Sequence, residues 1–280
     1  MYVLGAIVLS TAISCQGQGA SSANASDSTA NEELTTTSND VPEYTINDLP
    51  RVDITKFKKN ADGAYILFDG SSLEGWRGYN QTSVPEKWSI KDGVLQLTAA
   101  TTGAGEEQHN DLVFAYDFKN FELSFDWKIS KNGNSGVFVL AKEVDGQPIY
   151  VSSPEFQLID NVGHPDASQG VNGNRKSASL YDMIPADPQN ANPAEEWNTS
   201  KIVVNNGTIT HYQNGEKVVE YTVWTPEWTA LLQNSKFSQE KWPLAFELLN
   251  HVGGDSKSGL IGIQDHGNDV SLKNITVKEL

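Results

Sequence analysis

One nine-residue run, residues 121–129, constrains the fold of this chain more than any other part of the sequence. Its five apolar residues alternate strictly with two acids, a serine and a lysine. Successive side chains of a β-strand point to opposite faces, so this pattern is typical of a strand with one face in a core and the other in water. The sequence therefore predicts a sheet with one solvated face, as antiparallel sheets commonly have.

Shorter runs of the same kind, bounded by turn residues, continue along the chain. We expect strands at 64–68, 87–90, 94–98, 136–141, 155–160, 201–204, 208–213, 217–222, 260–264 and 270–277. Asn205-Asn206-Gly207 and Asn214-Gly215 predict two hairpin turns. Only 226–234 has a helical pattern, with Pro226 at an early helical position. We predict one all-β domain, an antiparallel β-sandwich of the jelly-roll type with one short helix.

The first 45 residues differ from the rest of the chain. Residues 1–14 are almost wholly apolar and directly precede Cys15, the single cysteine. This run is too short to cross a bilayer but has the length of a signal-peptide apolar region. It resembles a bacterial lipoprotein signal, in which the cysteine becomes lipidated, although no Lys or Arg precedes it. The alternative is a buried apolar segment with a structural cysteine.

This N-terminal pattern also predicts the domain organisation and the location of the protein. Residues 15–45 are rich in small polar residues and cannot bury enough apolar surface to fold, so we expect a flexible tether. Residues 46–280 would then form the single folded domain. We expect an exported lipoprotein, held at the periplasmic or outer-membrane surface through its lipid anchor.

Charge and aromatic content limit the class of ligand. The chain has 36 acidic and 20 basic residues, a net charge of −16, which disfavours nucleic acid and anionic membrane surfaces. We therefore expect membrane contact only through the lipid anchor. Seven Trp and nine Tyr suit flat, neutral ligands such as sugars, although most aromatic residues in any domain are core.

The run 155–160 places polar side chains on a predicted strand. Glu155 and Gln157 share the face opposite Phe156, and Asp160 would join them only through a bulge. The spacing is similar to the catalytic strand of laminarinase-like glycosidases, in which two carboxylates act as nucleophile and general acid. Because Gln157 replaces the middle carboxylate, ordinary retaining hydrolysis is disfavoured.

A second polar group follows the apolar run at 259–263 without an intervening turn. On a strand, Gly262, Gln264 and His266 share one face, and the glycine would leave room for a ligand. Asp265 points with the isoleucines, so we expect it to bind a turn or backbone groups. Gln264 and His266 would then line the rim of a site.

Three further residues are candidate sugar contacts. Tyr181 and Trp197 could bind a sugar ring, although burial in the core is the commoner outcome for such residues. His211 alternates with Ile209, a pattern that favours packing, and is kept as a candidate contact.

Oxygen and nitrogen ligands for a divalent cation are also present. His164 lies on a loop after the strand at 155–160, where it is either a ligand, a base or a plain surface histidine. Glu155 and His266, with Asp160 and His164 nearby in the predicted site, could hold Zn, Mn or Ca. No established metal-binding spacing supports this, and we expect no organic cofactor.

Taken in chain order, these segments resemble the 3-keto-disaccharide hydrolase family, exported jelly-roll proteins of the concanavalin A-like and laminarinase-like type. The resemblance is carried by Leu67-Phe68-Asp69-Gly70, Leu73-Glu74-Gly75-Trp76, Trp88 with Asp92-Gly93, Asn134-Ser135-Gly136, Glu155-Phe156-Gln157 with Asp160, Ser179-Leu180-Tyr181, Trp197-Asn198, His211-Tyr212-Gln213-Asn214-Gly215, Ser235-Lys236-Phe237 and Gln264-Asp265-His266-Gly267. Two departures are a longer stretch at 239–258 and Tyr212 at a position where Trp is common.

The resemblance implies an activity on glycosides already oxidised to a ketone at C3. A base removes the acidified C2 proton, the leaving group departs from C1, and water adds to the enone. Such chemistry needs a base, an electrophile or metal at the ketone, and a proton source for the leaving oxygen. We expect catalytic roles for Glu155, Asp160, His164 and His266. Sugar contacts would come from Gln157, Tyr181, Trp197, His211 and Gln264.

Two other functions remain open at this point. Jelly rolls serve as lectins as readily as enzymes, so a non-catalytic carbohydrate-binding module is the main alternative. A laminarinase-like retaining hydrolase is a distant third. In all three cases the expected ligand is a carbohydrate.

Overall fold

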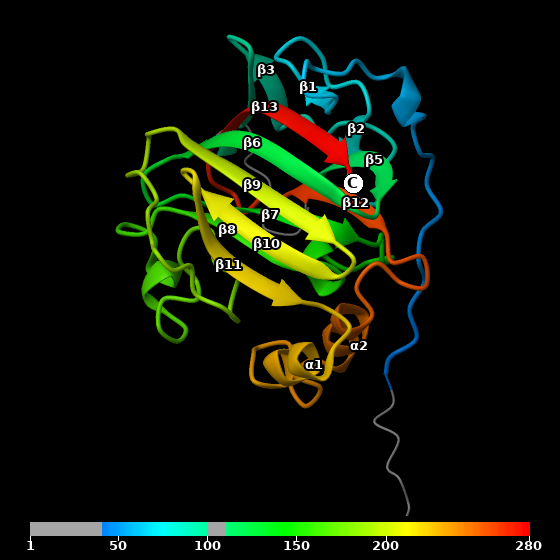
Figure 1. Ribbon diagram of the computed structural model, residues 1–280, viewed down its shortest axis with the longest axis vertical. Helices are drawn as coiled ribbons and strands as arrows, with labels where there is room; N and C mark the ends of the chain where they lie inside the picture. The colour runs from blue at the N-terminus through cyan, green and yellow to red at the C-terminus, as the bar shows by residue number, and fades with distance from the viewer. Residues whose placement is uncertain (1–40, 100–109) are drawn as a thin grey trace, which may run out of the picture. The chain divides into compact units, whose positions relative to one another are not determined.

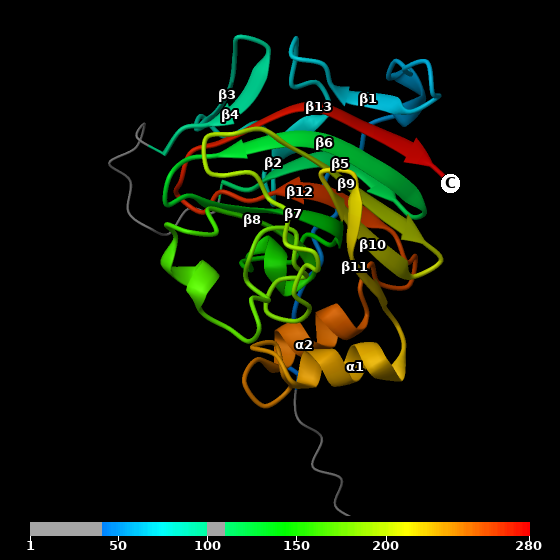
Figure 2. The same ribbon diagram turned by 60° about the vertical axis from the view of Figure 1, so that its left-hand side comes forward.

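Two antiparallel β-sheets, packed face to face, form the fold (Figures 1 and 2). The structure is a computed structural model that describes residues 41–99 and 110–280, all within one compact unit, Asn39–Leu280. The signal segment 1–14, Cys15 and most of the predicted tether lie outside the described residues. Within the described part of the chain, no helix is long and apolar enough to cross a bilayer.

The larger sheet has eight strands. In spatial order they are β11 (Glu216–Thr222), β10 (Thr208–Gln213), β9 (Asn198–Asn205), β6 (Phe121–Ile129), β13 (Val270–Glu279), β4 (Val94–Leu97) and β3 (Trp88–Lys91), with β1 (Tyr65–Phe68) also paired to β13. The smaller sheet has the order β2 (Trp76–Gly78), β5 (Leu112–Phe118), β12 (Gly259–Ile263), β7 (Asn134–Ala141) and β8 (Glu155–Ile159). The predicted antiparallel sandwich of the jelly-roll type is confirmed.

The core lies between the sheets and follows the alternation of the strands. All five apolar residues of β6 are buried, while the polar residues between them are only half-buried. Phe125 of β6 meets Phe156 of β8 edge to face, with ring centroids 5.8 Å apart, so the two sheets are in direct contact here. Both predicted hairpins, β9–β10 and β10–β11, are present.

Two strands and one helix were not predicted. β5 is an almost continuous apolar run, because residues on both of its faces are buried, and it lacks the alternation that reveals a half-buried strand. β2 has only three residues. The prediction of one helix is wrong: besides α1 (Pro226–Gln233), as expected, the described residues include α2 (Pro243–Asn250).

The second helix lies within residues 239–258. Trp228 of α1 donates a hydrogen bond from Nε1 to the backbone oxygen of Leu249, 2.8 Å away. Helix α1 contacts β11, and α2 contacts a 3-10 turn at Ile149–Val151 (Figure 2). Tertiary packing of this kind stabilises an eight-residue helix whose own propensity is marginal.

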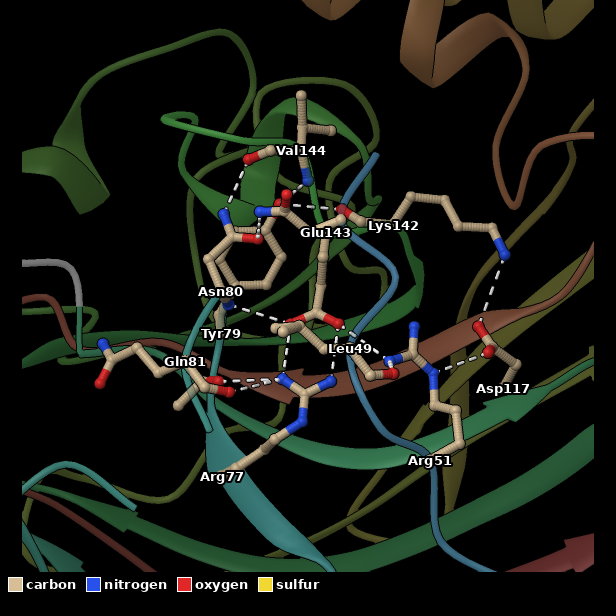
Figure 3. Close-up of polar contacts among 12 residues, drawn as sticks. Leu49, Arg51, Arg77, Tyr79, Asn80, Gln81, Asp117, Lys142, Glu143 and Val144 are labelled. Atoms are coloured by element: carbon tan, nitrogen blue, oxygen red, sulfur yellow. Dashed lines mark hydrogen bonds and ion pairs between the residues drawn. The ribbon is translucent and has the colours of Figure 1, made fainter. Parts of the chain in front are cut away.

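A buried ion-pair network fastens the segment before β1 to the smaller sheet (Figure 3). Glu143 is fully buried, and its carboxylate accepts hydrogen bonds from Arg77 at 2.6 and 2.7 Å and from Arg51 at 3.1 Å. The backbone N–H of Asn80 donates to the same carboxylate at 2.9 Å, and Arg51 also pairs with Asp117 at 2.8 Å. Every charge in this network has a partner, as burial requires.

Candidate active site

The candidate site is built on the face of the smaller sheet that points away from the core. In β8, Phe156 enters the core, so Glu155 and Gln157 point the opposite way. Gly136 pairs with Gln157 in the register of β7 and β8, and the backbone N–H of Gln264 donates to the oxygen of Gly136 at 2.9 Å. The structure therefore brings Glu155, Gln157 and Gln264 onto one face, as the sequence predicted.

At two glycines of this face, a neighbouring side chain occupies the space where a Cβ would lie. Glu155 folds back over Gly136, where the carboxylate oxygen Oε1 fills the space that a Cβ would need. At Gly262 the sequence predicted room for a ligand, but the side chain of Ile149 occupies that space instead. Gly262 therefore does not leave the space for a ligand that the sequence predicted.

The carboxyl group of Glu155 has an unusual environment, because the residue is only 7% exposed. Burial raises its pKa to about 8; the charge of Lys236 opposes this rise, and the negative charges of Asp111 and Asp166 add to it. Glu155 is therefore largely protonated near neutral pH. A protonated carboxyl group can donate a proton or a hydrogen bond, which an ionised one cannot.

Lys236 comes from the loop between the two helices and was not predicted. Its Nζ lies 4.3 Å from the ring centroid of Tyr181, 4.9 Å from that of Phe237 and 5.4 Å from that of Tyr150. Cations are attracted to aromatic faces at such distances. The only signal in the sequence was the segment Ser235-Lys236-Phe237, which carries part of the family resemblance but says nothing of its place in the fold.

Two histidines meet at the rim of the site. His164 and His266 pack edge to face, with ring centroids 5.8 Å apart. Partial burial of the ring and the charge of His164 lower the pKa of His266, although the residue is reached by solvent. A neutral imidazole at this position is able to accept a proton.

A hydrogen-bonded cluster fixes the loop that carries His164. The backbone N–H of Asp166 donates to His164 Nδ1 at 3.2 Å, and the Asp166 carboxylate accepts from the hydroxyl of Tyr181 at 2.8 Å. Arg175 pairs with Asp166 and with Asp182, each at 2.6 Å. Tyr181 is thus positioned by its hydroxyl, with its ring against Lys236.

A second buried carboxyl group, Asp111, was also not predicted. It precedes β5, is 1% exposed, and accepts a hydrogen bond from the backbone N–H of Asp265 at 2.8 Å. Burial raises the pKa of Asp111 to about 7, and the charge of Asp265 contributes to the rise. Since β5 itself carries no sequence signal, nothing in the sequence placed Asp111 beside the site.

Amide side chains complete the face. Gln264 is buried, and its side-chain oxygen has no hydrogen-bond partner among the described residues; the same is true of Asn134 on β7. Gln157 accepts a hydrogen bond from the backbone N–H of Leu158 at 3.1 Å. Unpaired buried acceptors are costly, so a hydroxyl-rich ligand would stabilise this arrangement.

Asp265 plays the structural role that the sequence predicted. Its carboxylate accepts hydrogen bonds from the backbone N–H of Gly267 at 2.9 Å, from Lys87 at 3.0 Å and from Asn110 at 3.1 Å. These contacts fix the turn after β12 and with it the position of His266.

Three predicted site residues do not reach this face. Asp160 accepts hydrogen bonds from the backbone N–H groups of Asn132 at 2.9 Å and Val162 at 3.0 Å. Burial alone would raise the pKa of Asp160, but these bonds and one from Gly163 outweigh it and lower the pKa. Asp160 is thus an ionised residue of the turn, and a role in proton transfer does not fit its contacts.

His211 and Trp197 lie elsewhere in the sandwich. His211 is 1% exposed, contacts the backbone oxygen of Ala178 at 2.8 Å through Nδ1, and packs against Phe156 on the core side of β8. Trp197 lies beneath Lys128 and Lys273 on the outer face of the larger sheet. The expectation of sugar contacts at these two residues does not fit their positions. Sequence alternation shows which side chains share a face, but not to which sheet a strand belongs or which of its faces meets the core.

The described residues contain no group of three or more His, Cys, Asp or Glu side chains arranged to hold a metal ion. Glu155 and His266, the expected Zn, Mn or Ca ligands, therefore have no third side chain of these types arranged with them.

Comparisons with known proteins agree with the resemblance. Residues 63–278 match the family model of the 3-keto-alpha-glucoside-1,2-lyase-like domain. A 3-keto-disaccharide hydrolase from Bacteroides thetaiotaomicron is 50% identical over 96% of this chain and 94% of its own. Two crystal structures of proteins from Parabacteroides distasonis are also similar. One is 30% identical, with a TM-score of 0.68, and the match covers 79% of this chain and 95% of the other. The second is 26% identical, with a TM-score of 0.56, and the match covers 78% of this chain and 99% of the other. This chain belongs to the 3-keto-alpha-glucoside-1,2-lyase-like domain family.

Proposed function

We propose that this protein is an enzyme that cleaves the glycosidic bond of 3-keto-glycosides by elimination followed by hydration. The proposal rests on family membership and on one observation: a buried, largely protonated carboxyl group, Glu155, lies on the same sheet face as unpaired amide groups. The second carboxylate of a standard glycosidase is missing, because Gln157 takes its position and Asp160 serves a turn.

The reaction needs no oxocarbenium ion. The C3 ketone acidifies the C2 proton; a base takes that proton, and the C2–H electron pair forms an enolate with its charge on the C3 oxygen. The enolate then collapses, so that this pair becomes the C1–C2 double bond as the C1–O bond breaks. The leaving oxygen takes a proton from a general acid. Water then adds across the double bond, its oxygen to C1 and its proton to C2, so that the net change is hydrolysis.

Two side chains have protonation states that suit these steps. His266, whose lowered pKa leaves it neutral near pH 7, is the proposed base for the C2 proton. Glu155, whose burial raises its pKa to about 8, is the proposed proton donor to the leaving oxygen. The contact between His164 and His266 gives His164 a role in orienting the base.

Amides and one aromatic ring would hold the sugar. Gln264 and Asn134 offer unpaired acceptors to hydroxyl groups, and Gln157 shares their face. Tyr181 presents a ring fixed by its bond to Asp166. Sugars are commonly bound by this combination of apolar faces and convergent polar groups.

The proposal includes export, because residues 1–14 and Cys15 resemble a lipoprotein signal. The protein would act at the periplasmic or outer-membrane surface, held there by lipid on Cys15. A Cys15→Ser variant expressed in a bacterial host should leave the membrane fraction, whereas membrane retention of that variant would contradict the anchor.

One assay tests the activity. The protein is incubated with a 3-keto-glucoside and with the unmodified glucoside, each with and without a chelator. We expect release from the keto sugar alone, and a loss of about 100-fold or more in kcat for Glu155→Gln, as is usual when a general acid is removed. Release from the unmodified glucoside would contradict the proposal, and binding without turnover of either would favour a carbohydrate-binding module.

A further inference from the structure

We propose that the ammonium group of Lys236 is a catalytic electrophile that stabilises the enolate oxygen at C3. The inference rests on the proposed function and extends it, because removal of the C2 proton places negative charge on the C3 oxygen. A positive group already fixed beside that oxygen would stabilise the charge as it develops.

The loop that carries Lys236 is held in place at several points. The backbone N–H of Lys236 donates to the carboxylate of Asp182 at 2.8 Å, and Asp182 is itself paired with Arg175. Ser235 donates a hydrogen bond to the backbone oxygen of Leu232 at 2.8 Å. A group fixed in this way needs little reorganisation when charge develops beside it.

Aromatic rings surround Nζ of Lys236. Three aromatic rings, from Tyr150, Tyr181 and Phe237, lie within 5.4 Å of it. Burial lowers the pKa of Lys236, and the charges of Asp182 and, when it is ionised, Glu155 oppose that change. Aromatic faces stabilise an ammonium over a neutral amine, so the ring contacts fit an electrostatic role better than a nucleophilic one.

Lys236 also lacks an acceptor for its N–H groups. Across residues 41–99 and 110–280, no hydrogen bond or ion pair joins Nζ of Lys236 to an oxygen. Other partly buried lysines differ: Lys87 pairs with Asp265 at 3.0 Å, and Lys142 with Asp117 at 3.4 Å. An ammonium that is largely surrounded by protein and has no acceptor is left with donors that a ligand oxygen can use.

The position of this cation relative to Glu155 fits the reaction. The two groups are close enough for the charge of Lys236 to lower the pKa of Glu155 against the effect of burial. A keto sugar bound over Gly136 would therefore have a proton donor and a fixed cation on the same side. The oxygens on C1 and C3 lie on either side of C2, so the two groups would serve different oxygens of one ring.

The test compares Lys236→Met, which keeps the length of the side chain and removes its charge, with Lys236→Arg, which keeps a charge. Lys241→Met is the matched control, because Lys241 lies in the same loop but is exposed, and its Nζ makes only a long contact, 3.4 Å, to the backbone oxygen of Ser235. Two rates are measured: kcat on a 3-keto-glucoside, and deuterium uptake from D₂O at C2 of 3-keto-1,5-anhydroglucitol. Because this analogue has no leaving oxygen on C1, the second rate follows enolisation alone.

We expect Lys236→Met to lower both rates by about 100-fold to 1,000-fold with KM changed only a few-fold, and Lys236→Arg to recover part of the loss. Lys241→Met should match the wild type. If Lys236→Met does not fold by circular dichroism, Lys236→Gln takes its place. Deuterium uptake within tenfold of wild type, a rise in KM alone, or a covalent adduct at Lys236 trapped by borohydride would each overturn the proposal. Absence of wild-type turnover would instead overturn the proposed function.

Discussion

The carboxylate of Glu155 occupies the space that a side chain at Gly136 would fill. The two residues lie on neighbouring strands, β8 and β7, so pairing of the strands and placement of the proposed acid are coupled. Gly136 does not have a left-handed backbone, which means that the glycine serves close approach and not an unusual turn. The direction of the Glu155 carboxyl group therefore depends on the absence of a Cβ at residue 136.

Gly136→Ala should consequently displace the carboxyl group of Glu155 without preventing strand formation. We expect kcat/KM on a 3-keto-glucoside to fall by about 10-fold to 100-fold, because small misplacements of a catalytic group are costly. Overpacking should reduce the free energy of unfolding by about 1–3 kcal/mol, which leaves a folded protein to measure.

The Glu155→Gln background controls for unrelated damage. If Gly136 acts through Glu155, adding Gly136→Ala to Glu155→Gln should lower kcat/KM little further. The effects of substitutions at two residues that act as a unit do not add. A full additional loss in the double variant would mean that Gly136 matters for another reason.

Asp111 should tune the pH dependence of the same carboxyl group. Its negative charge raises the pKa of Glu155, so Asp111→Asn should lower that pKa. If protonated Glu155 is the acid, kcat/KM falls as the pH rises through its pKa, about 8 in the free wild-type protein. In Asp111→Asn this fall should occur at lower pH.

The measurement is the pH profile of kcat/KM for Asp111→Asn, with the exposed Asp255→Asn as control. The amide introduced by Asp111→Asn keeps an oxygen for the backbone N–H of Asp265, so the contact at that turn is preserved. A basic limb that moves to higher pH, or that moves equally in the control, would contradict the assignment.

Local pattern predicted much of the fold because strand faces and hairpin turns are local properties. β6, β10 and both hairpins were predicted for this reason, and so was the shared face of Glu155 and Gln157. β5 escaped prediction because burial of residues on both of its faces removes the alternation. Helix α2 depends on its contact with Trp228, which no local pattern reveals.

The site could be predicted only where strands supply it. Gln264 followed from strand alternation, whereas Lys236 comes from a loop and Asp111 precedes a strand with no signal. His211 and Trp197 had suitable chemistry, but their positions depend on how two sheets pack together. The residues that sequence reasoning missed are therefore those that tertiary packing alone brings to the site.

His211 should make the fold sensitive to mild acid. Burial lowers the pKa of His211 to about 4, compared with 6.5 when it is solvated. The folded state thus favours neutral His211. The contribution of His211 to the free energy of unfolding is therefore complete above pH 6.5, and it is lost as the pH falls from 6.5 to about 4. A shift of this size corresponds to about 3 kcal/mol.

The raised pKa values of Glu155 and Asp111 act in the opposite direction, because folding favours their protonated forms. The effect of His211 is therefore isolated by a difference: the free energy of unfolding of the wild type minus that of His211→Gln, measured by urea from about pH 7 to about pH 4. That difference should shrink toward acid pH. A difference that stays constant over this range would contradict the prediction.

The Glu143 network should matter for stability far more than a surface pair. Glu143→Ala leaves Arg77, which is 5% exposed, without its partner, and we expect a loss of about 3–5 kcal/mol in the free energy of unfolding. Glu220→Ala removes a half-exposed pair with Lys217 and should cost less than about 1 kcal/mol. Urea denaturation of both variants tests this, and equal losses would mean that the buried pair contributes no more than the exposed one.

Gln264 and Trp197 offer the sharpest test of where the sugar binds, because sequence reasoning assigned both the same role and the fold separates them. Gln264 lies on the face with Glu155 and has an unpaired side-chain oxygen, while Trp197 lies on the outer face of the other sheet. Gln264→Ala should raise KM for a 3-keto-glucoside by about 5-fold to 30-fold, the equivalent of one lost hydrogen bond of about 1–2 kcal/mol. Trp197→Ala should leave KM within about twofold of wild type. The reverse result would move the sugar site to the larger sheet, because an indole between Lys128 and Lys273 affects binding only if the ligand reaches that face.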